Sequence, residues 1–143
     1  MGSTSNPVTV PPPRYALCNG QQLFYWSDNA TFFSGFILIE LVPPAGWTQV
    51  FYGNLYPALP LPKFQRIPIL YGQMNTGCGV FYNEDLTPPG SNYIAWYYDA
   101  TGTLVAGPTQ PFTVSSGAMV NSFTPPILTL PIPTTPGIPV QPD

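Results

Sequence analysis

The chain has few charged residues and no histidine. Only 6% of its 143 residues are Asp, Glu, Lys or Arg, whereas typical globular chains contain about 25%. Without histidine, no Ser–His–Asp triad can form within the chain. Two cysteines cannot supply the four Cys and His ligands of a structural zinc site. Three basic residues and a net charge of −3 argue against nucleic-acid binding by phosphate neutralisation.

Long apolar runs are also missing. The densest one, FFSGFILIELV at 32–42, is interrupted by Ser34, Gly35 and Glu40, and it is shorter than the ~18 residues of a membrane span. The first residues, MGSTSNPVTVPPPR, show neither the basic region nor the apolar region of a signal peptide. We therefore expect a chain that is made in the cytoplasm and has no membrane partner.

The two cysteines, Cys18 and Cys78, lie far apart in the sequence. Without an export signal, two reduced thiols in apolar surroundings are the favoured interpretation, because disulfides are rare in the cytosol. A disulfide is the alternative, since spacing alone does not show whether the two side chains meet.

Proline is abundant, with 21 residues, and it is concentrated at the two ends. This distribution predicts three zones: an extended N-terminal arm at 1–13, a β-sandwich domain at 14–121 and an extended C-terminal arm at 122–143. Proline fixes φ and removes a backbone donor, so the arms can form neither helices nor central strands. Polyproline II or extended edge-strand geometry remains for them.

The C-terminal arm reads SFTPPILTLPIPTTPGIPVQPD and carries a single charge, Asp143. A free tail in water usually has more charge and fewer large apolar groups. A stiff, apolar arm instead suits docking on a surface, its own or a neighbour's, because little conformational entropy is lost. We expect contact with neighbouring subunits. The predicted partner-binding residues are Phe123, Ile127, Leu128, Leu130, Ile132 and Ile138.

The middle of the chain predicts β-structure. FSGFILIEL at 33–41 alternates, with Ile37, Ile39 and Leu41 on one face, and NYIAWYYD at 92–99 is the clearest strand. Asp99 and Gly102 then occupy the first and fourth positions of a type I turn. Shorter β-rich runs lie at 47–53, 78–83, 103–107 and 111–114. Short strands separated by turns are typical of a sandwich or small barrel.

The segment PALPLPKFQRIPI at 57–69 breaks this pattern, and its prolines predict a long surface connection or an edge crossing. The basic residues Arg14, Lys63 and Arg66 are interpreted as ion-pair partners or solvated charges rather than catalytic groups.

The acidic residues offer only weak candidates for chemistry. Glu84 and Asp85 are adjacent and can in principle bind calcium or transfer protons, but a solvated turn is the favoured interpretation. Asp28 is followed by Asn29 in a similarly weak pair. No Gly-x-Ser-x-Gly motif is present, and no base exists to activate a serine. We therefore expect no enzyme, no metal and no cofactor.

Aromatic residues, at 15%, are the richest feature. The favoured interpretation is core and subunit interface, where Tyr and Trp are enriched. The alternative is an exposed platform that stacks on sugar rings, with polar partners such as Asn92 and Asp99.

The segment LTPPGSNYIAWYYDATGTLVAGPTQPFTV at 86–114 resembles the final hairpin of carboxypeptidase-regulatory-like, prealbumin-type domains. The shared features are Pro89-Gly90, a Tyr-rich strand, Asp99 and Gly102, then a closing strand. SGFILIEL at 34–41 is similar to the opening strand of that family. The resemblance implies an all-β, Ig-like or prealbumin-like sandwich with no catalytic residues.

Domains of this family are frequent in structural proteins of tailed bacteriophages. The resemblance therefore implies a virion protein, made in the host cytoplasm, that forms a capsid decoration, collar or tail-associated subunit. Its expected partners are other virion subunits, either further copies of itself in a homo-oligomer or a major capsid or tail protein. The alternative is a carbohydrate-binding adhesion module at a tail fibre or tail tip, with a surface glycan as the partner.

Overall fold

The computed structural model describes residues 14–53, 59–116 and 122–132. Within these ranges the protein is all-β and contains no α-helix, which confirms the predicted class. The strands are β1 (Tyr15–Cys18), β2 (Gly35–Val42), β3 (Phe51–Tyr52), β4 (Leu59–Pro60), β5 (Phe64–Leu70), β6 (Gln73–Met74), β7 (Gly79–Phe81), β8 (Leu86–Thr87), β9 (Asn92–Asp99), β10 (Leu104–Ala106) and β11 (Ser122–Phe123). One 3-10 turn, η1, spans Asn83–Asp85. The same ranges hold no helix of the length and hydropathy that a membrane crossing requires.

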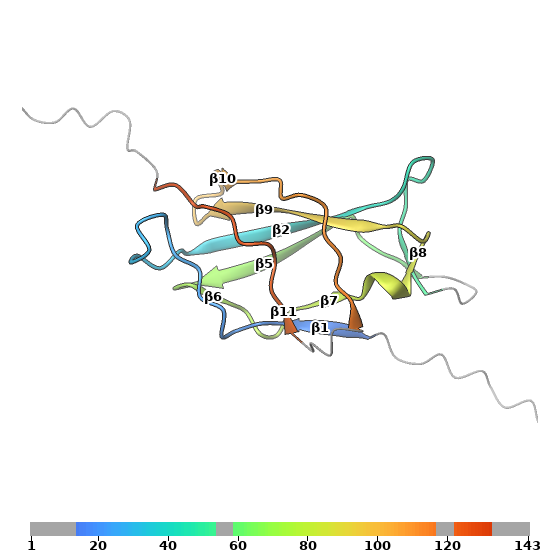
Figure 1. The fold of residues 1–143 in the computed structure, drawn as a ribbon, viewed down its shortest axis with the longest axis horizontal. Helices are drawn as coiled ribbons and strands as arrows, with labels where there is room; N and C mark the ends of the chain where they lie inside the picture. Colours follow the sequence, from blue (N-terminus) through green and yellow to red (C-terminus); the bar gives the residue numbers. More distant parts are fainter. Residues whose placement is uncertain (1–13, 54–58, 117–121, 133–143) are drawn as a thin grey trace, which may run out of the picture.

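The largest sheet has five strands in the order β10-β9-β2-β5-β6 (Figure 1). β2 and β9 are antiparallel and remain in register from Gly35, opposite Asp99, to Val42, opposite Asn92. The predictions of strands at 33–41 and 92–99 are thus confirmed. The Asp99 turn is confirmed as well, because the Gly102 amide donates to the Asp99 carbonyl at 3.0 Å.

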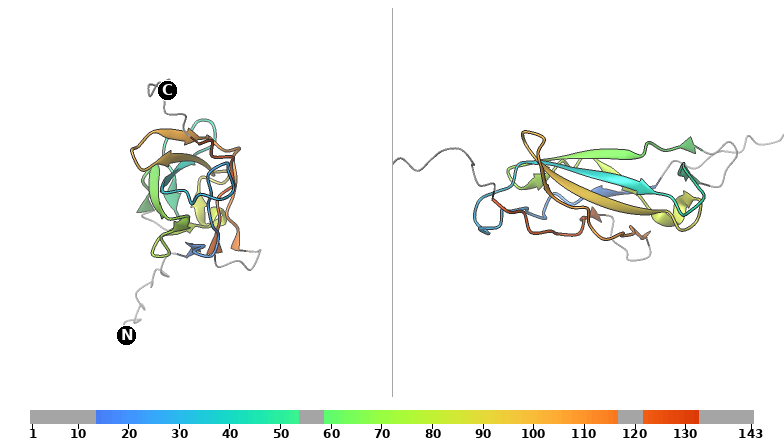
Figure 2. Two further views of the ribbon diagram at one scale, coloured as in Figure 1. Left: turned by 90° about the vertical axis from the view of Figure 1, so that its left-hand side faces the viewer. Right: turned by 90° about the horizontal axis from the view of Figure 1, so that it is seen from above.

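Two smaller sheets accompany the large one. β11, β1 and β7 form the first, in which β11 is parallel to β1 and β7 is antiparallel to it. β4, β3 and β8 form the second. Figure 2 shows the long strands β2, β5 and β9 on one side of the molecule, with β1 and the C-terminal segment on another.

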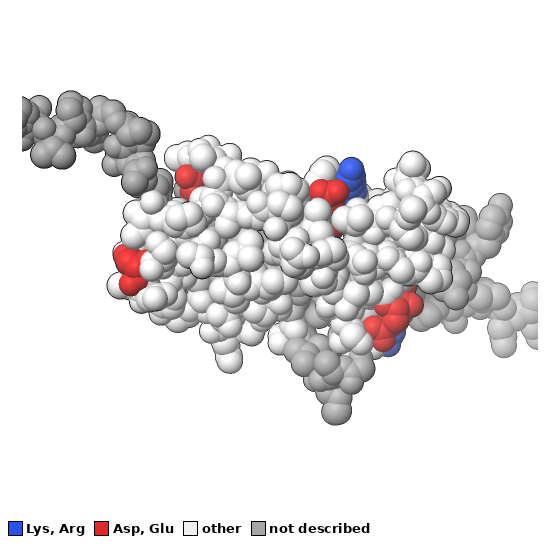
Figure 3. Space-filling model, turned by 45° about the horizontal axis from the view of Figure 1, so that its top comes forward, with Lys and Arg blue, Asp and Glu red and all other residues white. Residues whose placement is uncertain are grey.

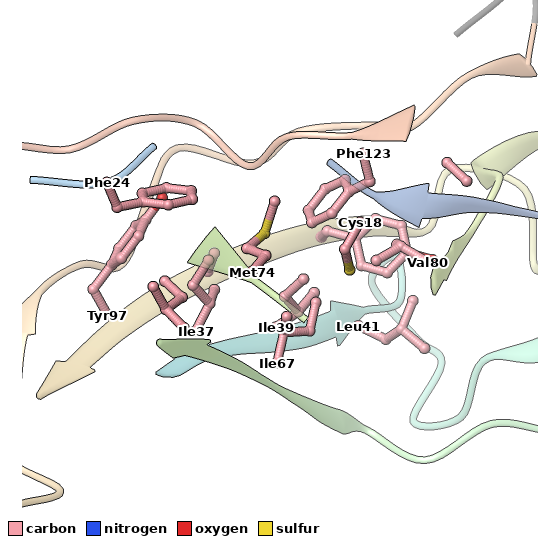
Figure 4. Packing of buried hydrophobic residues seen from close by; sticks show 14 of the residues in the cluster. Cys18, Phe24, Ile37, Ile39, Leu41, Ile67, Met74, Val80, Tyr97 and Phe123 are labelled. Atoms are coloured by element: carbon pink, nitrogen blue, oxygen red, sulfur yellow. The ribbon is translucent and has the colours of Figure 1, made fainter. Parts of the chain in front are cut away.

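The core lies between the five-stranded sheet and the β1 sheet (Figure 4). Alternation along β2 points Ile37 and Ile39 inward, at 0% and 1% exposure, because successive side chains of a strand face opposite sides. From β9, Tyr97 is fully buried at 0%. Every buried side-chain nitrogen and oxygen within the described ranges has a hydrogen-bond partner.

The expectation of a connection or edge crossing at 57–69 is wrong for its second half. Residues from Phe64 onward form β5, which lies between β2 and β6. Pro68 is tolerated because its carbonyl accepts from Asn75, on the β6 side of the strand. In an antiparallel pair the nitrogen and carbonyl of one residue point the same way, so the missing N–H costs no hydrogen bond to β2.

Two shorter predictions are only partly right. Of the run at 47–53, only Phe51 and Tyr52 form a strand. The run at 111–114 forms no strand, and only Phe112 makes an isolated bridge to Tyr93. N-terminal to this bridge the contact with β9 continues irregularly, because the Thr109 amide donates to the Ala95 carbonyl at 2.9 Å.

Candidate interaction surfaces

The described part of the C-terminal arm, residues 122–132, lies against its own domain. β11 pairs with β1, and the Asn19 amide donates to the Phe123 carbonyl at 2.9 Å. Phe123 and Leu130 are each only 2% exposed, and Pro125 is fully buried. These three side chains close one side of the core.

The segment is held mainly through its carbonyl groups, as expected for a chain whose prolines lack N–H donors. The Tyr97 hydroxyl donates to the Pro126 carbonyl at 2.7 Å. The Ser27 amide donates to the Leu130 carbonyl at 2.8 Å, and the Ile132 amide donates back to the Ser27 hydroxyl at 3.3 Å. The segment is therefore fixed along its length rather than at one point.

The six predicted partner-binding residues separate into groups. Phe123 and Leu130 point into the core of their own domain, and Leu128 packs against that core while partly exposed. Ile127 and Ile132 point outward, at 57% and 50% exposure. Ile138 lies outside the described residues. A role in partner binding stays a prediction for all six, and among the described ones the outward-facing residues are free to make such a contact.

The face of the five-stranded sheet that points away from the core is apolar, and we call it the outer sheet face. Antiparallel sheets usually carry polar residues on such a face. Here the charged positions are Glu40 and Arg66. Its apolar positions are Phe36, Leu38, Val42, Phe64, Pro68, Leu70, Ile94, Trp96, Tyr98 and Leu104, and its neutral polar positions are Gln73 and Asn92.

Three side chains on the outer sheet face form a row. The Phe36 and Tyr98 rings are stacked, with centroids 5.0 Å apart and planes 9° apart. The guanidinium carbon of Arg66 lies 3.8 Å from the Phe36 ring centroid, a cation–π geometry. The described part of the chain contains two ion pairs, Arg14–Asp85 and Lys63–Glu40, so Arg66 takes part in neither. Its charge thus remains available to an anionic partner.

The acidic pair Glu84–Asp85 serves the fold. Asp85 accepts a bidentate interaction from Arg14, at 3.0 Å from Nε and 2.8 Å from Nη2. This interaction raises the pKa of Arg14. Glu84 accepts hydrogen bonds from the hydroxyl and the amide of Ser116, which lower the Glu84 pKa. Both carboxylates are therefore occupied by neighbours within the chain.

Two further carboxylates hold turns. Asp99 accepts from the Thr101 hydroxyl and from the amides of Thr101 and Thr103, and its pKa is lowered mainly by the hydroxyl. Asp28 is held in the same way by the hydroxyl and amide of Thr31, with the same effect on its pKa. No group of three or more Cys, Asp or Glu residues that could hold a metal occurs in the described ranges.

The two cysteines meet across β1 and β7. The Cys18 amide donates to the Cys78 carbonyl at 2.9 Å. Both thiols are free in the structure, with Cys18 buried and Cys78 partly exposed. Burial, together with the neighbouring Cys78, raises the pKa of Cys18 to about 12. A thiol that stays protonated at neutral pH is a poor nucleophile, so Cys18 acts as a core residue.

A groove of about 1000 Å³ runs between β1 and the β5–β6 turn. Leu17, Leu70 and Met74 line it together with Asn and Gln side chains, and no charged residue belongs to its lining. It therefore offers contact area without a carboxylate, lysine or arginine side chain.

Few charges interrupt the visible surface. Figure 3 shows charged atoms in a few separate spots on the face that it draws, with uncharged atoms between them. One pattern in the sequence indicates this surface. In FILIEL and IAWYY both alternating sets of residues are mostly apolar. Such a pattern is typical of a strand whose two faces both contact other parts of a protein. Comparison with protein-family models, curated proteins and solved structures finds no match to this chain.

Proposed function

We propose that this protein is a non-enzymatic structural subunit of a bacteriophage particle, as a capsid decoration, collar or tail-associated component. The observation that carries the proposal is the apolar exterior. Within the described ranges, large hydrophobic side chains at least 45% exposed are Tyr15, Leu17, Phe32, Trp47, Leu59, Phe64, Leu70, Tyr71, Leu104, Ile127 and Ile132. Single exposed apolar residues need no explanation. Phe64, Leu70 and Leu104, however, share the outer sheet face with further apolar side chains, and such a gathering suits an interaction site.

The chemistry of this exterior suits assembly. Protein interfaces are enriched in aromatic residues and Arg, and the outer sheet face carries Phe36, Trp96, Tyr98 and Arg66 beside one acidic residue, Glu40. Contacts that depend little on charge also persist when salt screens electrostatic attraction. Such contacts suit a particle that must survive changes in ionic strength outside the cell.

The fold supports a passive role. A prealbumin-like sandwich would supply a rigid body. The proline-rich sequence at 1–13 and the part of the predicted arm 122–143 that follows residue 132, both outside the described residues, are proposed to contact neighbouring subunits. The proposed partners are further copies of this chain or a major capsid or tail protein. The proposed location is the virion, after synthesis in the host cytoplasm.

The test is the composition of the assembled particle. Quantitative mass spectrometry of purified particles of the encoding phage should find the chain in a fixed ratio to the major capsid protein. Ile127→Asp together with Ile132→Asp should lower that ratio, because both side chains point outward. Thr48→Asp serves as the matched control, because it adds the same charged side chain at an exposed polar position. Particles that lack the chain would contradict the proposal.

A carbohydrate-binding module is the second candidate, favoured by one aromatic cluster. The Tyr25 and Phe32 rings stack with centroids 5.1 Å apart, in the hairpin that also carries Asn29. Tyr71 is 72% exposed, and its amide donates to the Ser34 hydroxyl beside this hairpin. A glycan array should then give a hit that Tyr71→Ala abolishes. An array without hits, in which assembly depends on the same aromatics, would count against this candidate.

A further inference from the structure

The outer sheet face lacks a described covering element, and the chain itself contains a segment with matching chemistry. Residues 133–143, PTTPGIPVQPD, place Pro133, Pro136, Pro139 and Pro142 at a strict spacing of three. Polyproline II has three residues per turn. In that geometry the four proline rings would form one continuous ridge along the segment.

We propose that the outer sheet face of one copy binds the proline ridge of residues 133–143 of another copy. This inference rests on the proposed assembly role and names the surface that receives the arm. Proline-rich segments bind surfaces lined by aromatic rings, where the pre-extended chain loses little entropy. On the outer sheet face, Phe36, Tyr98 and Trp96 supply such rings.

The length and starting point of the segment fit this arrangement. Eleven residues in polyproline II span about 34 Å, whereas the eight residues of β2 span about 26 Å. The segment can therefore cross the whole sheet. Residue 132 is bound to Ser27 beside Leu130, on the core side of the sheet, so a stiff segment leaving this point reaches another copy more directly than its own outer face.

Charge is complementary as well. The segment carries one charged residue, Asp143. The outer sheet face presents Arg66, which lies over Phe36 and takes part in neither ion pair of the described residues. An exposed carboxylate–guanidinium pair is worth about two- to fivefold in affinity, so it orients the segment rather than driving its binding.

The contact is heterologous, because a tail binds a face and not another tail. Such contacts leave one tail and one face unused in every pair and can continue into rings or chains. Sedimentation velocity of the full chain should show an average mass that rises with concentration.

Two variants of the full chain separate donor from acceptor. Trp96→Ser alters the face, and Pro136→Ser with Pro139→Ser alters the ridge. Each should weaken association about tenfold or more, as expected for loss of a buried aromatic or matching anchor. Trp47→Ser and Thr134→Ser with Gln141→Ser are the matched controls and should associate like the parent. Mixing the two defective variants should give closed one-to-one pairs, since each supplies what the other lacks.

A charge exchange tests the contact without altering the core. Arg66→Glu should weaken association, and Asp143→Arg in the same chain should restore it. If Trp96→Ser fails to fold, this pair of variants still tests whether the outer sheet face binds residues 133–143.

The contrary outcomes are distinct. If the ridge variant associates like the parent while the face variant does not, the face binds a second face and the inference is wrong. If the parent stays monomeric at every concentration, the inference is also wrong. In that case the chain would still be found in particles if the proposed function holds.

Discussion

The hydroxyl of Tyr97, at the centre of the core, donates a 2.7 Å hydrogen bond to the carbonyl of Pro126. Tyr97 belongs to the middle of β9, whereas Pro126 belongs to the proline-rich C-terminal segment. One partly buried hydrogen bond thus joins a long strand of the main sheet to the proline-rich segment.

Replacing Tyr97 by Phe removes this bond and leaves the Pro126 carbonyl without its donor. We expect a loss of about 1–3 kcal/mol in the free energy of unfolding, measured by urea denaturation. Limited proteolysis should also cut the segment 122–132 faster. Tyr93→Phe is the matched control, because its hydroxyl binds the Phe81 carbonyl instead. It should lower stability without exposing the segment, and equal proteolysis of both variants would contradict the assigned role.

Truncation should have two different effects, depending on the cut. The sequence alone suggests that the whole arm 122–143 can be removed from a folded domain. The structure changes this expectation, because Phe123, Pro125 and Leu130 belong to the core. Losing side chains of this kind costs about 2–5 kcal/mol each.

A chain ending at residue 121 should therefore lose cooperative thermal unfolding. A chain ending at 132 should keep a melting temperature close to that of the full chain. If the chains ending at 121 and at 132 had the same melting temperature, residues 122–132 would contribute nothing to the stability of the core.

Gly35 is required where β2 meets β9. A Cβ at this position would collide with the carbonyl oxygen of Tyr98 and would lie 2.9 Å from the Cα of Asp99. Because both atoms belong to the backbone, the strands must separate, and Gly35→Ala should cost about 1–3 kcal/mol in urea denaturation. Gly77→Ala, where the nearest atom is a side-chain oxygen of Asn75 at 3.2 Å, is the milder comparison. If Gly77→Ala lowered the free energy of unfolding more than Gly35→Ala does, the close approach of Gly35 to the β9 backbone would be disproved.

The two thiols should differ in reactivity. In the native protein at pH 8, iodoacetamide should modify Cys78 first, because Cys18 is 3% exposed and its pKa is raised to about 12. Modification of Cys18 should follow the rate of unfolding and become fast in urea. Peptide mapping by mass spectrometry gives both rates, and prompt labelling of native Cys18 would contradict its burial.

Stability should fall at alkaline pH. Cys18 has a folded pKa of about 12, above the ordinary thiol value, and burial also raises the pKa of Tyr93 and Tyr97. The folded state then binds more protons than the unfolded state from about pH 9 upward, so the free energy of unfolding decreases with rising pH. The urea midpoint should be flat between pH 7 and 8 and lower at pH 10.5. Cys18→Ala should reduce the slope, and a midpoint that rises with pH would overturn this assignment.

Part of the fold was predictable because some segments carry their own pattern. Ile37 and Ile39 alternate with less buried residues, and Asp99 and Gly102 mark a tight turn, so 33–41 and 92–99 could be assigned from local sequence. β5 was missed because Pro68 argues against a strand within a sheet. Whether a missing N–H matters depends on which neighbour that nitrogen faces, and this is set by tertiary structure.

The candidate surfaces were predictable only in composition. The apolar arm was identified from its sequence, but the division into inward Leu130 and outward Ile127 depends on where the segment lies against the sheet. Likewise, both faces of β2 are visibly apolar, whereas the row of Arg66, Phe36 and Tyr98 requires the register between three strands.

The pairing of β11 with β1 has a consequence for the order of folding. Asn19 bonds to Thr124, and Ser27 to Ile132, each across 105 positions of sequence. Contacts this distant form late, since a long loop must close first. During synthesis, β1 would therefore emerge long before its parallel partner and leave one side of the core open to water. Subunits would complete their fold only after the start of the proline-rich arm is made, which would delay assembly until the arm is present.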